Sequence, residues 1–511
     1  MWMVGEFDSG GCAMRPPSRV CERCATELSQ YNPGALCALC SKAGTAPGVP
    51  DRAWRDEAVY RALAAWDFGE LLRLVRRRAG LSQMAVRELT ALPQSFISGL
   101  ERGQKQIGSP VTLLDLLNGL GLPSDLQSLL LTPLRGDAPK PGHGRSTEVV
   151  LPWTADRMVT SLEVAIGGTA MKRRRVLTAL SGAALTQYVL QSAIAPTEAV
   201  AASSGTTTVT DALIGSLQST TDALRQVDAT SGSGSLAHTA KTHLQMLLHL
   251  LKHGSYSERH GRRLAAVTAD TAAQTGWYTF DGGDHDAAQH LFLGALRAAH
   301  ASGDSRLRAG ALGFLAIHGY SVGDPRDAIT AARTARQTIT EHDAPALNAM
   351  LLTRQARGHA RLREERHALA ALAEAEELCA RGRGEDDPHW LYWVHTGEIL
   401  GQTGSCYLDL GQPDRAAQSF AAARDVLSRD EIRTTAQFLS RAATAQMRAG
   451  DADAGCATAH DVLTLAEGIA SARLDDHLRN MLNEARSYGA SSPARTLLER
   501  GENVMRQRAA A

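Results

Sequence analysis

Aromatic residues are scarce in this sequence, and neither sign of charge is in excess. Only 5% of the 511 residues are aromatic although 44% are hydrophobic, so the core must be built mainly from Ala, Leu and Val. That composition favours close-packed helices over a β-sandwich and predicts an all-α protein. Lys+Arg and Asp+Glu both number 54. Any affinity for nucleic acid must therefore come from a local basic patch.

Cysteines and catalytic motifs are also sparse. Eight cysteines in a chain of this length are too few for a disulfide scaffold, which favours a reducing compartment. No charged segment followed by an apolar core opens the chain, so we expect no ordinary signal peptide and a cytoplasmic protein. The sequence has no Walker-A lysine loop, H-E-x-x-H, G-x-S-x-G or dinucleotide fingerprint. We therefore expect that the protein is not an enzyme.

Changes in composition divide the chain into four zones. Pro47 and Pro50 follow a cysteine-paired head, and the Pro/Gly-rich run from Pro133 to Gly144 interrupts any helix, as linkers do. We expect a head at 1–48, a basic helical domain at 51–132, a linker with a basic and apolar helical segment at 133–210, and an Ala-rich helical domain at 211–511.

Two tight cysteine pairs predict a structural zinc site in the head. Cys21 and Cys24 are followed, after twelve residues, by Cys37 and Cys40. Four thiolates at this spacing suit tetrahedral Zn²⁺ and leave no open coordination position, so the metal would be structural rather than catalytic. Metal binding would supply folding free energy that so small a head lacks. An iron–sulfur or redox role and unligated thiols are the alternatives.

A local basic patch lies between Arg73 and Lys105, where seven basic residues stand against two acidic ones, a charge of +5. Ser82 is placed to cap a short helix over about 83–90. A further helix starts at Pro93, whose fixed φ suits a first helical turn. We expect two short helices with a tight turn between them. A small helical bundle with a solvated basic face is the alternative.

This pattern resembles the helix-turn-helix of the XRE family, the fold of phage repressors and Cro, over about residues 67–122. The resemblance rests on Gly80-Leu-Ser-Gln83 and on Gln94-Ser-Phe-Ile-Ser-Gly-Leu-Glu-Arg-Gly103. It implies that the partner is double-stranded DNA and that the third helix of the domain enters the major groove. It also implies a homodimer, because one such domain covers only a half-site.

The resemblance also implies which residues touch DNA. Gln94 and Ser95 would read base edges, and other side chains would lie nearby or hold phosphates. The whole set is Gln83, Gln94, Ser95, Phe96, Ser98, Arg102 and Lys105. Phe96 would either pack in the protein or touch a thymine methyl. Pro93 replaces a common capping Ser or Thr, and Gly99 stands where a longer reading side chain is common, so base specificity is modest or shared with the head.

The Ala-rich region repeats itself. Ala288, Ala328, Ala368, Ala416 and Gly455 align at spacings of 40, 40, 48 and 39 residues. In the first and fourth units a Phe follows a Gly sixteen residues later. Small residues let the two helices of a unit approach closely, and the aromatic ring fills the gap to the next unit. The region resembles a tetratricopeptide-repeat (TPR) solenoid over about residues 262–470, which implies an α-solenoid of helical hairpins.

The longest spacing marks a candidate ligand site. Its eight extra residues coincide with an aromatic stretch that contains Trp390, Tyr392 and Trp393. These side chains either face a ligand or pack between repeats. The arrangement also resembles peptide-sensing quorum regulators, in which asparagines clamp a peptide backbone. The candidate asparagines are Asn348, Asn480 and Asn483.

The segment 172–195 combines a basic run with an apolar stretch, a pattern found in export signals and membrane anchors. Lys172-Arg-Arg-Arg175 followed by an apolar stretch resembles a twin-arginine export signal, yet it lies far inside the chain. A membrane anchor over 176–195 is one interpretation, but several Thr, Gln and Ser residues weaken it. We favour a helix that packs on the solenoid or acts as a lever between domains.

Together these patterns predict a one-component transcriptional regulator. The head and the helix-turn-helix domain would bind DNA, and the solenoid would bind a peptide, a small molecule or a protein. The alternative is a TPR-type interaction scaffold with weak or incidental DNA binding.

Overall fold

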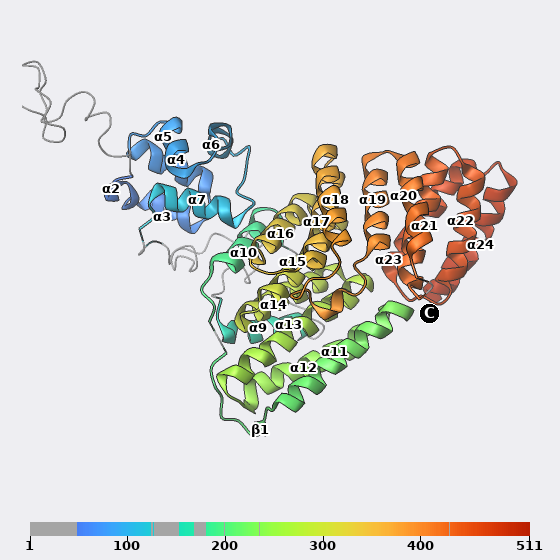
Figure 1. Ribbon diagram of the computed structural model, residues 1–511, viewed down its shortest axis with the longest axis horizontal. Coiled ribbons are helices and arrows are strands. Elements are labelled where there is room, and N and C mark those ends of the chain that lie inside the picture. Colours follow the sequence, from blue (N-terminus) through green and yellow to red (C-terminus); the bar gives the residue numbers. More distant parts are fainter. Residues whose placement is uncertain are drawn as a thin grey trace, which may run out of the picture.

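The structure is a computed structural model that describes residues 49–123, 126, 153–167, 180–198, 200–234, 236–428 and 430–510 (Figure 1). The described chain is almost entirely helical, which confirms the all-α prediction. Two short strands, β1 (Thr207–Thr208) and β2 (Gly254–Ser255), pair in parallel. The four cysteines predicted to bind zinc lie outside the described residues, so that prediction stays as stated.

The amino-terminal domain is a compact group of short helices. Its members are α2 (Asp51–Trp54), α3 (Glu57–Ala64), α4 (Phe68–Arg78), α5 (Gln83–Thr90), α6 (Gln94–Glu101) and α7 (Pro110–Leu120). Leu71, Val75 and Ile97 are fully buried in its core. The Ser82 hydroxyl accepts a hydrogen bond from the amide of Ala85, as the expected cap of α5.

The start of helix α6 differs in one detail from the sequence-based expectation. Pro93 is the residue before the first helical turn rather than part of it, and its side chain offers no capping hydrogen bond. Gly103 ends the segment with φ of +68°, a left-handed conformation that glycine adopts without strain. The turn before α6 contains Ala91 at φ +57°, so a non-glycine residue holds this conformation between the two helices of the motif.

Part of the predicted linker belongs to the core of the following domain. From Trp153 on, α9 (Ala155–Gly167) and α10 (Ala183–Ile194) bury apolar side chains against the repeat helices. The packing of α10 agrees with the favoured interpretation of its segment as a helix that packs on the solenoid. The bounds 133–210 stay a prediction. Among the described residues, no helix has both the length and the apolar character to cross a membrane.

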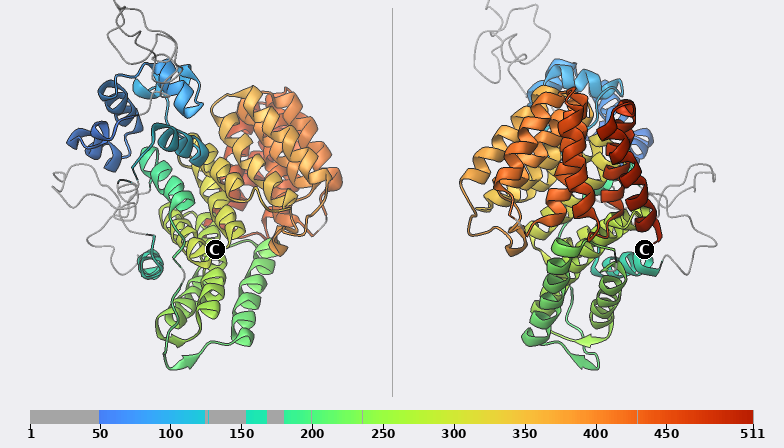
Figure 2. Two further views of the ribbon diagram at one scale, coloured as in Figure 1. Left: turned by 60° about the vertical axis from the view of Figure 1, so that its left-hand side comes forward. Right: turned by 90° about the vertical axis from the view of Figure 1, so that its right-hand side faces the viewer.

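The carboxy-terminal domain is an array of helical hairpins. It begins with α11 (Asp211–Ser231) and α12 (Leu236–His253). Six hairpins follow: α13 (Glu258–Asp281) with α14 (His285–Ser302), α15 (Ser305–Ser321) with α16 (Pro325–Thr338), α17 (Pro345–Arg361) with α18 (Glu365–Ala380), α19 (Thr396–Leu410) with α20 (Pro413–Val426), α21 (Ile432–Arg448) with α22 (Ala452–Ala466), and α23 (Ala472–Ala485) with α24 (Ser492–Ala510). The 3-10 turns η2 (His389–Leu391) and η3 (Arg486–Tyr488) interrupt the series. In both views of Figure 2 the blue amino-terminal helices and the green α11–α12 hairpin lie at opposite ends.

The repeat packing follows the small-residue and aromatic pattern of the sequence. A side chain at Gly276 would place its Cβ 2.6 Å from the ring of Phe292, so α13 and α14 approach closely only because this residue is glycine. The same Phe292 ring stacks on Phe314 of the next hairpin, with centroids 5.3 Å apart. Arg363 holds φ of +61° at the turn where the first, fourth and fifth units have Gly283, Gly411 and Gly450, also at positive φ. The third unit therefore keeps the turn geometry without the glycine.

Candidate DNA-binding surface and ligand cavity

The residues predicted to touch DNA gather at the amino-terminal end of α6 and after its end. Gln94, Ser95, Arg102 and Lys105 are exposed, whereas Gln83, Phe96 and Ser98 are half-buried. An exposed helix start with polar side chains is the geometry that a recognition helix needs, because base edges are read through hydrogen bonds.

A chain of polar contacts fixes Gln94 before any DNA is bound. Its side-chain amide donates to Gln83 at 2.8 Å, and Gln83 donates to Glu101 at 2.7 Å. Glu101 also accepts two hydrogen bonds from the Arg76 guanidinium, at 2.6 and 3.0 Å. Burial would raise the pKa of Glu101, but the hydrogen bonds from Arg76 and Gln83 outweigh it and lower the pKa. The carboxylate is therefore a structural anchor of the motif.

Gly99 lies under another side chain of the same domain. A Cβ there would lie 2.9 Å from two carbons of the Lys105 side chain, so the lysine stem packs over the glycine. The Lys105 ammonium lies 5.6 Å from the centre of the Phe96 ring. Position 99 therefore faces the following loop, and glycine there orients Lys105 instead of removing a reading side chain.

The basic patch is partly neutralised within the domain. Arg73 pairs with Glu70, Arg76 pairs with Glu101, and Arg78 pairs with Asp56 at 2.8 Å. The other basic side chains of the patch make no ion pair within the described part of the chain. They are Arg77, Arg87, Arg102 and Lys105. These four charges are not neutralised by an ion pair within the described domain.

The amino-terminal domain rests on the repeat domain through α7. Ser109, at the start of α7, accepts a hydrogen bond of 2.8 Å from Gln337 of α16. Leu190 of α10 is 1% exposed and belongs to the core of the amino-terminal domain. In Figure 1, α7 lies between α6 and this contact, so the contact does not cover α6.

Helix α10 is held on the repeat domain by polar contacts. The amide and carbonyl of Leu180 exchange hydrogen bonds of 2.6 and 2.8 Å with the side chain of Gln289. The Tyr188 hydroxyl donates to the carbonyl of Leu293 at 2.9 Å. Because α10 also packs against the amino-terminal core, it is a physical connection between the two domains.

The inner face of the hairpin array encloses a cavity of about 850 Å³. It is lined by the first helices of successive hairpins, by α11 and by the stretch around η2. Trp390, Tyr392 and Trp393 all line it, whereas Asn348 does not. Asn348 instead donates to the carbonyl of Ala344 at 3.1 Å. The side-chain oxygen of Asn348 also accepts a hydrogen bond of 3.4 Å from Arg336 of α16. Its role as a ligand residue stays a prediction.

The asparagine clamp has no counterpart among the lining residues. Asn480 and Asn483 are exposed and do not line the cavity. The peptide-backbone clamp of the quorum regulators therefore finds no geometric support here.

Sequence analysis missed the polar residues of the cavity wall, although the repeat alignment contains a signal for them. One lining residue lies fourteen positions before each aligned small residue. These residues are Gln274, Phe314, Arg354, Gln402 and Arg441. The repeat register places this position on the inner face of every first helix. The residue type at this position of each repeat, polar in four of the five units, would have indicated which side chains line the cavity.

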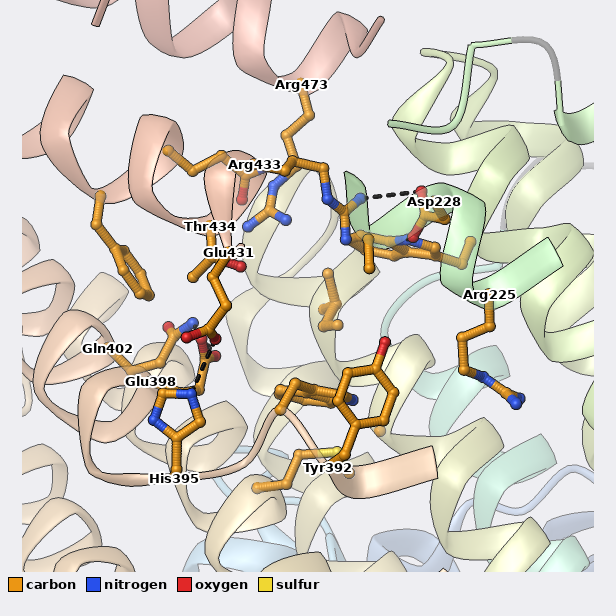
Figure 3. A pocket seen from close by; sticks show the side chains of 18 of the residues that line it. Arg225, Asp228, Tyr392, His395, Glu398, Gln402, Glu431, Arg433, Thr434 and Arg473 are labelled. Atoms are coloured by element: carbon orange, nitrogen blue, oxygen red, sulfur yellow. Dashed lines mark hydrogen bonds and ion pairs between the residues drawn. The ribbon is translucent and has the colours of Figure 1, made fainter. Parts of the chain in front are cut away.

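The cavity wall is rich in arginine. Six arginines line it against four carboxylates. Arg433 pairs with Asp228 at 3.2 Å and His395 with Glu431 at 2.8 Å, and Figure 3 shows both contacts at the cavity. Burial raises the pKa of Asp228, and Arg433 opposes this shift.

Comparisons with known proteins bear on the amino-terminal domain. Residues 67–130 match the family model of a helix-turn-helix domain. A search among curated proteins gives no match. The match supports a DNA-binding regulator. The XRE and TPR assignments stay predictions from the sequence.

Proposed function

We propose that this protein is a transcriptional regulator that binds double-stranded DNA through α6 and senses a ligand in the cavity of its repeat domain. The observation that carries the proposal is the exposed start of α6 within a helix-turn-helix domain that docks on the cavity-bearing array through α7 and α10. Gln94 is already oriented by Gln83, which reduces the entropy lost when it pairs with a base.

The route between the cavity and the DNA-binding surface is short. Helix α15 lines the cavity, and its hairpin partner α16 carries Gln337, which holds Ser109 of α7. A ligand that favours one placement of this hairpin over another would shift the population of DNA-competent molecules. The proposal includes a homodimer, since one helix-turn-helix domain covers a half-site. It also includes a zinc-stabilised head, on the grounds of the four cysteines alone.

DNA binding is tested with purified full-length protein and genomic fragments, including the region upstream of its own coding sequence, at two salt concentrations. The variant is the double change Gln94→Ala and Ser95→Ala. The control is Ser487→Ala with Gln507→Ala, two exposed changes near the carboxy terminus. We expect sequence-selective binding that the first variant loses and the control keeps.

Non-selective binding would contradict the regulator function. Binding to every fragment alike, sensitive to salt and unchanged in the Gln94/Ser95 variant, would leave only the phosphate contribution. The interaction-scaffold function would then replace the regulator.

A further inference from the structure

One corner of the cavity has more cationic groups than their neighbours can neutralise. Asp409 is the single carboxylate that pairs with both Arg357, at 3.0 Å, and Arg441, at 3.2 Å. Arg473 of α23 also lines the cavity, and within the described residues it makes no hydrogen bond or ion pair. The nearby carboxylate of Asp281 accepts from the Ser471 hydroxyl at 2.9 Å and is not in ion-pair contact with Arg473.

Burial and mutual repulsion act on the other cationic groups of this corner, whereas Asp409 raises the pKa of Arg357. Burial lowers the pKa of Arg441 to about 10 even though Asp409 opposes the shift. Burial also lowers the pKa of Arg473. The pKa of His477, which lines the same corner, is lowered well below its usual value by burial and by Arg441 and Arg473. Bringing these cations together costs free energy that a bound anion would recover.

The cavity wall also has more unpartnered hydrogen-bond donors than acceptors. Several lining residues have a buried polar atom with no partner within the described structure. These atoms are Nε of Arg225, Arg354 and Arg441, Nε2 of Gln437, and the hydroxyls of Tyr320 and Ser405. All of them can donate a hydrogen bond and none is an acceptor only. The wall therefore suits a ligand that brings acceptors.

Aromatic and apolar side chains also line the cavity. The guanidinium groups of Arg433 and Arg473 lie 5.3 and 5.6 Å from the ring of Trp277. Figure 3 shows Arg433 and Arg473 entering from one side, with Tyr392 and His395 on the other. Met350 also lines the cavity. A planar apolar body would pack between these groups while its acidic group reaches the arginines.

We propose that the cavity binds a small organic anion, in which a carboxylate or phosphate contacts Arg357, Arg441 and Arg473 and an apolar ring system packs against Trp277 and Tyr392. A volume of about 850 Å³ lies within the range of small-molecule sites. This inference rests on the proposed sensor function and names the chemistry of its ligand.

The test uses a matched pair of fluorescent probes. 8-Anilinonaphthalene-1-sulfonate carries an anionic group, and N-phenyl-1-naphthylamine has the same ring system without it. Full-length protein is titrated with each probe. We expect saturable binding of the anionic probe, and Arg473→Gln should weaken it by about tenfold or more while binding of the neutral probe is unchanged. Arg473→Lys, which keeps the charge, should restore much of the affinity.

The matched control is Arg479→Gln, an exposed arginine on the same helix that pairs with Asp476. It should leave both probes unaffected. Unchanged neutral-probe binding in Arg473→Gln shows that the variant is folded. Equal binding of both probes to the original protein, or an anionic-probe affinity that Arg473→Gln does not change, would overturn the proposal.

Competition then identifies the acid. Displacement of the anionic probe by 2-naphthoate indicates a carboxylate, and displacement by 2-naphthyl phosphate indicates a phosphate. Equal displacement by the neutral 2-naphthylmethanol would contradict an anion site. Stronger displacement by a short peptide with a free carboxy-terminal carboxylate would overturn the small-molecule assignment. These measurements contain no DNA, so their failure is separate from failure of the Gln94/Ser95 experiment.

Discussion

The amide of Gly182 donates a hydrogen bond of 2.8 Å to the buried carboxylate of Asp327. Gly182 immediately precedes α10, and Asp327 lies in the first turn of α16. This bond therefore ties the helix that reaches the amino-terminal core to the hairpin that touches α7.

The burial of Asp327 at this contact predicts a pH-dependent stability of the fold around α10. Burial raises the pKa of Asp327 from 3.8 to about 7, although the Gly182 amide opposes the shift. A carboxyl group whose pKa is higher in the folded state binds more protons there than in the unfolded state. Its contribution to stability therefore falls as pH rises from about 4 to about 7, by up to about 1.4 kcal/mol per pH unit.

Hydrogen exchange of the α10 amides measures this effect. After correction for intrinsic exchange rates, protection should decrease between pH 5.5 and pH 8, and Asp327→Asn should flatten that dependence. Asp453→Asn, an exposed change in the first turn of α22, is the control. An unchanged pH dependence in Asp327→Asn would show that another group causes the pH dependence.

The Glu101 anchor should determine the stability of the helix-turn-helix domain. Glu101→Ala leaves the Arg76 guanidinium and the Gln83 amide without their acceptor. We expect a loss of about 2 kcal/mol of domain stability and weaker binding to all DNA sequences. The pKa of Glu101 is lowered in the folded state, so the anchor stabilises above the unfolded pKa and is lost as pH falls through the folded pKa.

Thermal unfolding of full-length protein, followed through the amino-terminal transition, measures this loss. Glu88→Ala, an exposed acid of the same domain, should change stability by less than about 0.5 kcal/mol. Equal stability of the two variants would show that the network contributes little.

Two glycine substitutions in the repeat domain should change the free energy of unfolding in opposite directions. Gly276→Ala brings a Cβ to 2.6 Å from Phe292, which forces helices α13 and α14 apart and should cost about 1–3 kcal/mol. Gly215→Ala on the exposed face of α11 meets no atom within 4 Å and should stabilise by about 0.5–1 kcal/mol through helix propensity. Urea unfolding compares them. A stabilising Gly276→Ala would refute the close approach of α13 and α14.

The zinc prediction concerns the amino-terminal head. Purified protein should hold one Zn²⁺ per chain, which Cys21→Ser together with Cys24→Ser removes because two of the four thiolate ligands are lost. Elemental analysis after dialysis measures the metal. Cys379→Ser, a partly buried free cysteine of α18, should retain it. Iron in place of zinc would support the iron–sulfur alternative.

The local features of both helical domains were predictable from short stretches of sequence. The Ser82 cap and the Gly103 stop act within one or two turns of the chain, so their effects do not depend on distant residues. The pairing of Gly276 with Phe292 was likewise visible as a recurring spacing. Three aromatic residues of the cavity, Trp390, Tyr392 and Trp393, could be named as candidates because they lie close together in the inserted stretch around η2.

Other features depended on distant parts of the chain. Arg473 and Trp277 come together only when α23 curves back toward α13, and no local pattern encodes that curvature. The same holds for Leu190, whose apolar environment is in another domain.

The sequence by itself therefore determined the all-α class, the helix-turn-helix and the repeating hairpins, because capping, turn formation and helical periodicity are local properties. The tertiary structure alone decided that α10 joins the two domains and that arginines from α17, α21 and α23 share one cavity corner. The physical reason is that burial and charge proximity depend on how successive hairpins pack, and each hairpin adds a rotation that the sequence of one unit does not specify.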